Sequence, residues 1–149
     1  MKILIVEDDS YKYSKVRAFL QDLIAQSEFI HKDSVHGAVL YLRSEKPDLV
    51  ILDMSLPSHS LVAGQGSPVS MPAGGIEVIM ELKLLGKTDI HIVVLTQYPN
   101  VEIEDEYYSI PQSQELIREL YGMERIEVIY YDNESADWSV KLRGALLPI

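Results

Sequence analysis

The sequence has no cysteine among its 149 residues. A disulfide framework, a thiol nucleophile and a thiolate metal site are therefore excluded. No apolar run approaches the ~20 residues that a membrane-spanning helix needs. The apolar run at 1–6 stops at three acidic residues, too early for the apolar core of ~7–15 residues of a signal peptide. We expect no membrane segment, and the composition favours a cytoplasmic protein.

Basic residues are also scarce. The chain has 13 Lys and Arg against 23 Asp and Glu, for a net charge of −10. Residues 97–149 hold 11 of the acidic residues and only 4 of the basic ones. Nucleic acids and anionic membranes are bound by clustered Lys and Arg, so neither is an expected partner. The acidic half either maintains solubility or faces a basic partner, and the composition leaves both open.

The hydrophobic fraction of 47% is enough for one core, and we predict a single domain over residues 1–149. Short apolar runs at 2–6, 28–31, 49–52, 90–95 and 126–131 predict strands, the second being the weakest. Helical spacing of apolar residues follows each run. Asp9 or Ser10 can cap the first helix, and Pro111 can start the fourth. This alternation predicts an α/β fold with a doubly wound parallel sheet.

Acidic residues and a threonine follow the predicted strands directly. Glu7 and Asp8 come after the first strand, Asp53 after the third, and Thr96 ends the fourth. In such sheets ligands bind beyond the carboxyl ends of the strands, so these side chains are expected to converge. Three carboxylates at short range need a cation, and Mg²⁺ prefers such oxygens. The alternative is that each acid only caps a helix or ends a strand. Their joint placement favours a site.

Such a site suits phosphoryl transfer. A carboxylate beside Mg²⁺ can attack a phosphoryl group, and the metal offsets the repulsion between the two anions. The hydroxyl of Thr96 can donate to a phosphoryl oxygen. A hydrolase that uses Asp53 as nucleophile is disfavoured, because the sequence offers no evident general acid or base beside it.

Four stretches carry a family pattern in order along nearly the whole chain: ILIVEDD at 3–9, LVILDMSLP at 49–57, GGIE at 74–77 and VVLT at 93–96. Together they resemble the receiver domain of two-component response regulators. The resemblance implies a flavodoxin-like (βα)5 fold with strand order 2-1-3-4-5. It also implies phosphoryl transfer to an aspartate from a partner histidine kinase or phosphotransferase, with output through a downstream protein.

Carried over by position, the resemblance assigns roles to individual residues. Asp53 is the expected phosphoacceptor. Glu7, Asp8 and Asp53 are the expected Mg²⁺ ligands, together with the backbone carbonyl of Ser55. Thr96 is the expected switch hydroxyl. Of the tyrosine pair at 130–131, one is expected in the core and the other at the switch-aromatic position.

The chain departs from the family at the end of the fifth strand, where receivers carry a lysine that pairs with the phosphoacceptor. The equivalent position falls within Tyr131, Asp132 and Asn133, and no lysine occurs between Lys87 and Lys141. The expected catalytic lysine is therefore missing. Arg118 or Arg125 can replace it only if a loop brings one of them into the site.

Two long segments also depart from the pattern. The Gly/Pro/Ser-rich loop at about 55–75 is some sixteen residues longer than in ordinary receivers. It can cover the site, hinder kinase docking, bind a partner or be a disordered insertion, since lengthening a loop costs little. The acidic segment 97–110, with Tyr107 and Tyr108, is expected as a loop that alters the output face.

Two functional classes remain. The first is a stand-alone receiver, phosphorylated on Asp53 with Mg²⁺ and acting through protein–protein interaction. The second is a degenerate receiver that acts as a phosphorylation-independent interaction module. In either case we expect no enzymatic activity beyond Mg²⁺-dependent autophosphorylation and autodephosphorylation at Asp53. We also expect no attached output domain, and a monomer or weak dimer.

Overall fold

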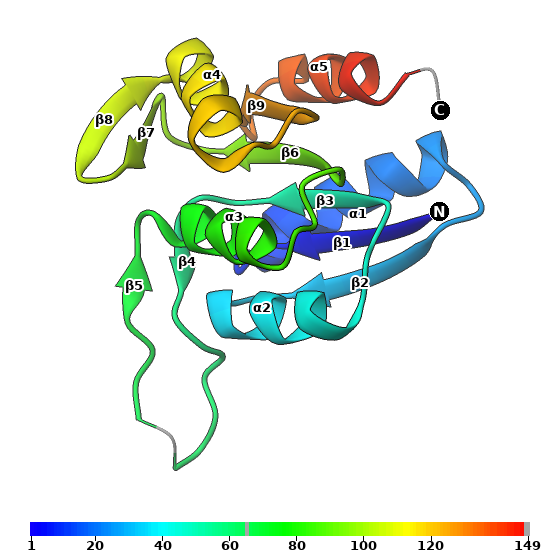
Figure 1. The fold of residues 1–149 in the computed structure, drawn as a ribbon. Coiled ribbons are helices and arrows are strands. Elements are labelled where there is room, and N and C mark those ends of the chain that lie inside the picture. The colour runs from blue at the N-terminus through cyan, green and yellow to red at the C-terminus, as the bar shows by residue number, and fades with distance from the viewer. Residues whose placement is uncertain (65, 148–149) are drawn as a thin grey trace.

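The computed structural model of the protein describes residues 1–64 and 66–147. A five-stranded parallel sheet forms its centre, with helices on both faces (Figure 1). The strands of this sheet are β1 (Lys2–Val6), β2 (Glu28–Lys32), β3 (Leu49–Leu52), β6 (His91–Thr96) and β9 (Ile126–Tyr130). The helices are α1 (Ser10–Leu23), α2 (Val35–Ser44), α3 (Gly74–Leu84), α4 (Ile110–Tyr121) and α5 (Asp137–Leu146). Among the described residues no helix is both long and apolar enough to cross a membrane.

The strand order is β2-β1-β3-β6-β9, which confirms the predicted order 2-1-3-4-5 and the flavodoxin-like α/β fold. All four neighbouring pairs are parallel. Val6 lies opposite Leu52, and Leu52 lies opposite Val94. The carboxyl ends of β1, β3 and β6 therefore meet at one edge of the sheet.

Alternate residues of each strand supply two cores. In β1, Leu4 and Val6 pack in a cluster with buried side chains of α2, α3 and α4. Ile3 and Ile5 pack in a second cluster with α1 and α5. Figure 1 shows α2 and α3 in front of the sheet and α1 behind it. A strand that is buried on both faces has no polar alternation, which explains the continuous apolar runs in the sequence.

The helix starts follow the predicted signals. The Asp9 carboxylate accepts the N–H groups of Tyr11 and Lys12 at 2.9 and 3.1 Å, so Asp9 is the N-cap of α1. Helix α4 has Pro111 in its first turn and a reciprocal capping box between Ser109 and Gln112. Capping fixes the start of a helix and thereby the direction in which its first side chains point.

The prediction of an irregular loop at 97–110 was wrong. This segment forms an antiparallel hairpin of β7 (Asn100–Ile103) and β8 (Glu106–Ser109). Its two turn residues, Glu104 and Asp105, have φ of 52° and 67°, as a type I′ hairpin turn requires. Val101 and Ile103 are buried in the core, whereas Asn100 and Glu102 are not. Such alternation is typical of a strand with one buried face. The acidic character of the segment concealed that alternation in the sequence.

The predicted loop at 55–75 is largely irregular but contains a short antiparallel pair, β4 (Leu56–Pro57) and β5 (Ser70–Met71). The carbonyl of Ser58 accepts the N–H of His36 at 3.0 Å. The hydroxyl of Ser60 donates to Asp33 Oδ1 at 2.5 Å. Both bonds attach the base of the insertion to the start of α2 and the residues before it.

Candidate functional site

The backbone places Glu7 and Asp53 side by side beyond the strand ends. The N–H of Glu7 donates to the carbonyl of Lys32, and the N–H of Asp53 donates to the carbonyl of Val6, both at 3.0 Å. The hydrogen bonding of the sheet thus continues one residue past β1 and β3. This continuation holds both carboxylates at the edge where β1, β3 and β6 meet.

The three acidic residues predicted to converge do so. One carboxylate oxygen from each of Glu7, Asp8 and Asp53 lies within 4.8 Å of the others. Glu7 and Asp53 are buried, whereas Asp8 is exposed. Clustered carboxylates that are partly open to solvent suit Mg²⁺, which keeps several waters when it binds to protein. These residues therefore fit the expected metal.

A lysine that the sequence analysis did not consider enters this cluster from α1. The Lys12 ammonium lies 2.7 Å from Glu7 Oε1 and 3.3 Å from Asp53 Oδ1. It also donates to the carbonyl of Leu95 at 2.5 Å. Only 2% of the Lys12 side chain is exposed. Lysine is rarely buried to this degree unless it is paired, and here carboxylates provide the pairing.

The electrostatics of the buried carboxylates are unusual. Burial raises the pKa of Glu7 to about 8, because loss of water and the nearby Asp53 charge outweigh the opposing effect of Lys12. Burial also raises the pKa of Asp53, although Lys12 and the N–H of Met54 oppose the shift. Perturbed acids in a cleft are typical of functional sites, and a divalent cation here would favour the charged forms of both groups.

The acidic cluster lines a small cavity of about 150 Å³. The wall of this cavity consists of Glu7, Asp8, Asp9, Asp53, Ser55, Gln97 and Tyr98. Ser55 thus lines the same cavity as the three carboxylates, and the role of its carbonyl as a metal ligand stays a prediction.

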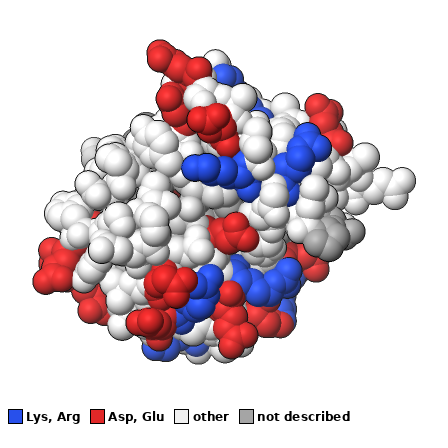
Figure 2. Space-filling model, turned by 90° about the horizontal axis from the view of Figure 1, so that it is seen from above, with Lys and Arg blue, Asp and Glu red and all other residues white. Residues whose placement is uncertain are grey.

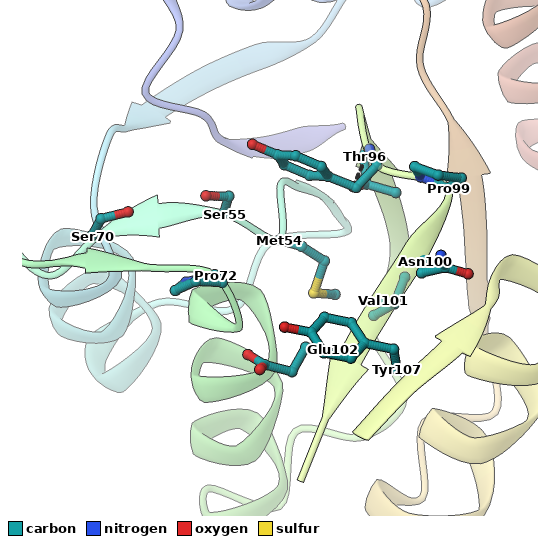
Figure 3. A pocket seen from close by; sticks show the side chains of 11 residues that line it. Met54, Ser55, Ser70, Pro72, Thr96, Pro99, Asn100, Val101, Glu102 and Tyr107 are labelled. Carbon is teal, nitrogen blue, oxygen red and sulfur yellow. Dashed lines mark hydrogen bonds between the residues drawn. The ribbon is translucent and has the colours of Figure 1, made fainter. Parts of the chain in front are cut away.

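A larger cavity of about 430 Å³ adjoins the first, sharing Ser55 and Tyr98 with it. Ser70 and Pro72 reach this cavity from the β4–β5 side, and Glu102 and Tyr107 from the β7–β8 hairpin (Figure 3). The two segments that depart from the family pattern therefore form opposite walls of one cavity beside the acidic site.

Thr96 connects the site to β9. It is fully buried and lines the larger cavity. Its hydroxyl accepts the N–H of Tyr98 at 3.2 Å, and its carbonyl accepts the N–H of Tyr131 at 2.7 Å. Tyr131 is 1% exposed and Tyr130 is 42% exposed, so one tyrosine lies in the core, as expected, and the other faces solvent. The switch role of Tyr130 stays a prediction.

The three candidate positions for the family lysine differ in placement. Tyr131 is buried, and its ring centroid lies 5.2 Å from the Lys12 ammonium. Asn133 is exposed, and Asp132 accepts the N–H of Glu134. The proposed arginine substitutes do not reach the site. Arg118 pairs with Glu115, and Arg125 lines a cavity with Met1 at the amino-terminal edge of the sheet.

Gly75 permits the close approach of α3 to the acidic site. A Cβ atom at this position would lie 2.6 Å from the carbonyl oxygen of Asp53 and 2.9 Å from Met54 Sδ. The N–H of Gly75 donates to the Met54 carbonyl at 2.9 Å. The glycine pair at 74–75 in the sequence therefore has a local steric role beside Asp53.

Surface charge is mixed on the face that Figure 2 shows. Acidic and basic side chains are interspersed there around an uncharged area. The few basic residues of the chain thus form no broad positive patch on this face.

Comparisons with known proteins agree with the fold. No family model matches the chain. It is 45% identical over 141 residues to the Detocs response regulatory protein DtcB of Vibrio alginolyticus, covering 93% of this chain and 95% of that protein. It is 24% identical over 151 residues to the uncharacterized protein y4jR of Sinorhizobium fredii, covering 100% and 99% of the two chains.

Solved structures of receivers share the fold. The phosphorylated cyanobacterial phytochrome response regulator RcpA superposes with a TM-score of 0.63 at 22% identity, covering 96% of this chain and 89% of that one. The response regulator TrrA of Thermotoga maritima, in complex with Mg²⁺–BeF, superposes with a TM-score of 0.61 at 21% identity, covering 97% and 98%.

Proposed function

Because this chain belongs to the response regulators with a receiver fold, we propose that it accepts a phosphoryl group on Asp53 with Mg²⁺ bound beside it. The observation that carries the proposal is the convergence of the Glu7, Asp8 and Asp53 carboxylates at the edge of the sheet. The same fold holds Mg²⁺ and a beryllofluoride in TrrA, which supports the transfer of this chemistry to the present site.

The proposed step is a phosphoryl transfer. One carboxylate oxygen of Asp53 attacks phosphorus and forms a new O–P bond, which gives an aspartyl phosphate. The bond between phosphorus and the donor breaks, and its electron pair leaves with the donor. The donor is the ring nitrogen of a phosphohistidine in a histidine kinase or phosphotransferase, or the acetate of acetyl phosphate in a test tube.

Each neighbouring residue has a part in this proposal. Glu7, Asp8, Asp53 and the Ser55 carbonyl would hold Mg²⁺, and the ion would offset the repulsion between the carboxylate and the phosphoryl group. The Thr96 hydroxyl accepts the N–H of Tyr98 and can at the same time donate its own proton to a phosphoryl oxygen. Hydrolysis of the aspartyl phosphate by water releases inorganic phosphate and restores the Asp53 carboxylate.

The output is proposed to pass to a downstream protein. The hydrogen bond from Tyr131 to Thr96 connects the site to β9, and the exposed Tyr130 lies at the end of that strand. A cytoplasmic location, which the cysteine-free composition favours, belongs to the same proposal.

A second candidate function is a phosphorylation-independent interaction module. The observation that favours it is the sequence Tyr131, Asp132 and Asn133 where receivers carry a lysine. Such a module would bind Mg²⁺ and partner proteins without forming an aspartyl phosphate.

Intact-mass spectrometry after incubation with Mg²⁺ and acetyl phosphate tests the proposal. The wild-type protein should gain one phosphoryl mass, and Asp53→Asn should gain none. The control is Asp22→Asn, since Asp22 is an exposed acid at the far end of α1. No gain in the wild-type protein would refute phosphoryl acceptance and leave the interaction module.

A further inference from the structure

The site lacks a lysine at the end of the last strand but does not lack a buried cation. Within residues 1–64 and 66–147, the ion pairs of Glu7 and Asp53 both come from the ammonium of Lys12 on α1. Lys12 follows Asp8 by four residues and belongs to none of the motifs that identify the family. Its position therefore needs a separate explanation.

The surroundings of Lys12 hold its ammonium at one point beside the acidic cluster. The Leu95 carbonyl accepts a hydrogen bond from it at 2.5 Å, and the ring of Tyr131 lies against it at 5.2 Å from the centroid. A cation over an aromatic face is attracted by the ring quadrupole. The ammonium is thus fixed by a carbonyl of β6 and a ring at the end of β9, as well as by two carboxylates.

Tyr131 lies in the segment in which receivers carry their lysine, and it is neutral and buried. Its hydroxyl has no hydrogen-bond partner among the described residues, so its evident contribution is the ring that packs against Lys12. A lysine from α1 and a tyrosine that directly follows β9 therefore lie in contact beside the carboxylates of Glu7 and Asp53.

We propose that Lys12 is the phosphoryl-binding cation of this receiver, supplied from α1 in place of a lysine at the end of β9. The ammonium already lies 3.3 Å from Asp53 Oδ1, within reach of an oxygen of a group transferred to that carboxylate. A positioned ammonium offsets the charge that develops on the phosphoryl oxygens during transfer. This inference rests on the proposed acceptance of a phosphoryl group by Asp53.

The other cations near the site do not fit this role. The Lys15 ammonium donates to the Asn133 carbonyl and lies over the ring of Tyr11, 4.9 Å from its centroid. Lys32 lies over the ring of Tyr41, 5.9 Å from its centroid. Lys15 is therefore a suitable control, because it belongs to the same helix and lies one turn away from Lys12.

Movement of Lys12 can be followed by the fluorescence of a nearby tryptophan. The Tyr131 ring that packs against Lys12 lies 5.1 Å, centroid to centroid, from the ring of Trp138 on α5. Trp138 is the single tryptophan of the chain. A shift of Lys12 from the carboxylates towards a phosphoryl group should therefore change the fluorescence of Trp138 through Tyr131.

The test compares rates of phosphorylation by acetyl phosphate with saturating Mg²⁺ in the full chain. We expect Lys12→Gln to slow the gain of one phosphoryl mass by on the order of 10- to 100-fold, the effect of losing a preorganised charge-stabilising group. Lys15→Gln should stay within about twofold of the wild-type rate, since its ammonium makes no contact with the carboxylates. The change in Trp138 fluorescence should also be lost in Lys12→Gln.

A thermal melt with and without Mg²⁺ separates a phosphoryl-binding role from a structural one. A slow Lys12→Gln variant that keeps its stabilisation by Mg²⁺ supports the proposal, because the acidic cluster is then intact. A wild-type rate in Lys12→Gln, or equal loss of the rate and of the Mg²⁺ response, overturns it. A wild-type protein that gains no phosphoryl mass instead overturns the proposed function itself.

A second variant covers the case in which Lys12→Gln does not fold. The double variant Lys12→Gln/Tyr131→Lys restores the charge from the end of β9, where receivers carry it. If Lys12→Gln folds, faster phosphorylation of the double variant supports the inference. If Lys12→Gln does not fold, any measurable phosphorylation of the double variant supports it. A folded double variant with no phosphorylation contradicts it.

Discussion

The Lys12 ammonium lies 3.3 Å from Asp53 Oδ1, although one residue belongs to the first helix and the other follows the third strand of the chain. This contact gives the predicted phosphoacceptor a buried counter-charge without a lysine after β9. It removes the main objection that the sequence raised against phosphoryl acceptance.

Binding of Mg²⁺ should raise the melting temperature of the protein. A ligand that binds only the folded state at about 100 times its Kd adds about 2.7 kcal/mol of stability. Asp8→Asn should remove most of this gain, because it deletes the exposed carboxylate of the cluster. The exposed Asp22→Asn is the matched control and should keep the full gain. Equal Mg²⁺ responses in both variants would contradict the assignment of the metal ligands.

The metal-free protein should lose stability as pH rises through the window set by Glu7. Its pKa rises on folding from an ordinary 4.5 to about 8. Between these two pKa values the folded protein keeps the Glu7 proton that the unfolded chain releases. The contribution of Glu7 to the free energy of unfolding is therefore complete below this pH window and is lost as the pH rises through it. Glu7→Gln, which cannot ionise, should gain stability relative to wild type across this window.

Chemical denaturation in a chelating buffer at several pH values measures that difference. The exposed Glu119→Gln serves as control and should show no such trend relative to wild type. A constant difference in unfolding free energy between wild type and Glu7→Gln would contradict the buried environment of Glu7.

Gly75→Ala should disturb the site directly. The added methyl would lie 2.6 Å from the Asp53 carbonyl oxygen, and forced overpacking of this kind costs about 1–3 kcal/mol. We expect lower unfolding free energy together with weaker binding of Mg²⁺. Gly144→Ala is the control, because a Cβ there meets no atom within 4 Å and alanine favours the helix. Calorimetry should show a lower unfolding free energy than wild type for Gly75→Ala and a higher one for Gly144→Ala. Equal changes in the two variants would refute the steric role of Gly75.

The fold was predictable because the apolar runs and the caps are local signals. The acids that follow β1 and β3 were predictable as a site, since parallel strands bring their carboxyl ends together. Lys12 was missed because a charged residue in a helix is ordinarily read as exposed. A signal was present: Lys12, Val16 and Leu20 are spaced by four and are all buried. A lysine in the first turn of a helix also opposes the helix dipole.

The two long segments could not be predicted to the same degree. The β7–β8 hairpin depends on a turn of two acidic residues with positive φ, which charge alone does not signal. The base of the 55–75 insertion is fixed by bonds to Asp33 and His36, which are distant in sequence. Their shared cavity beside Thr96 is a tertiary feature and has no signature in either segment.

Shortening the tip of the insertion should leave the reaction at Asp53 unchanged. The cavity around Asp53 is lined by residues 7–9, 53, 55, 97 and 98, and the hydrogen bonds that attach the insertion involve Ser58 and Ser60. Deletion of residues 62–67 should therefore keep the rate with acetyl phosphate within about twofold, since loop length has a small energetic effect. A much faster reaction would mean that the tip covers the site.

The most direct measurement locates the phosphoryl group within the chain. The protein is treated with Mg²⁺ and acetyl phosphate, reduced with borohydride to convert an aspartyl phosphate to homoserine, and mapped by peptide mass spectrometry. We expect homoserine at position 53, with none in Asp53→Asn and a reduced yield in Lys12→Gln. Modification at another aspartate, or none in a protein that binds Mg²⁺, would contradict phosphoryl acceptance by Asp53.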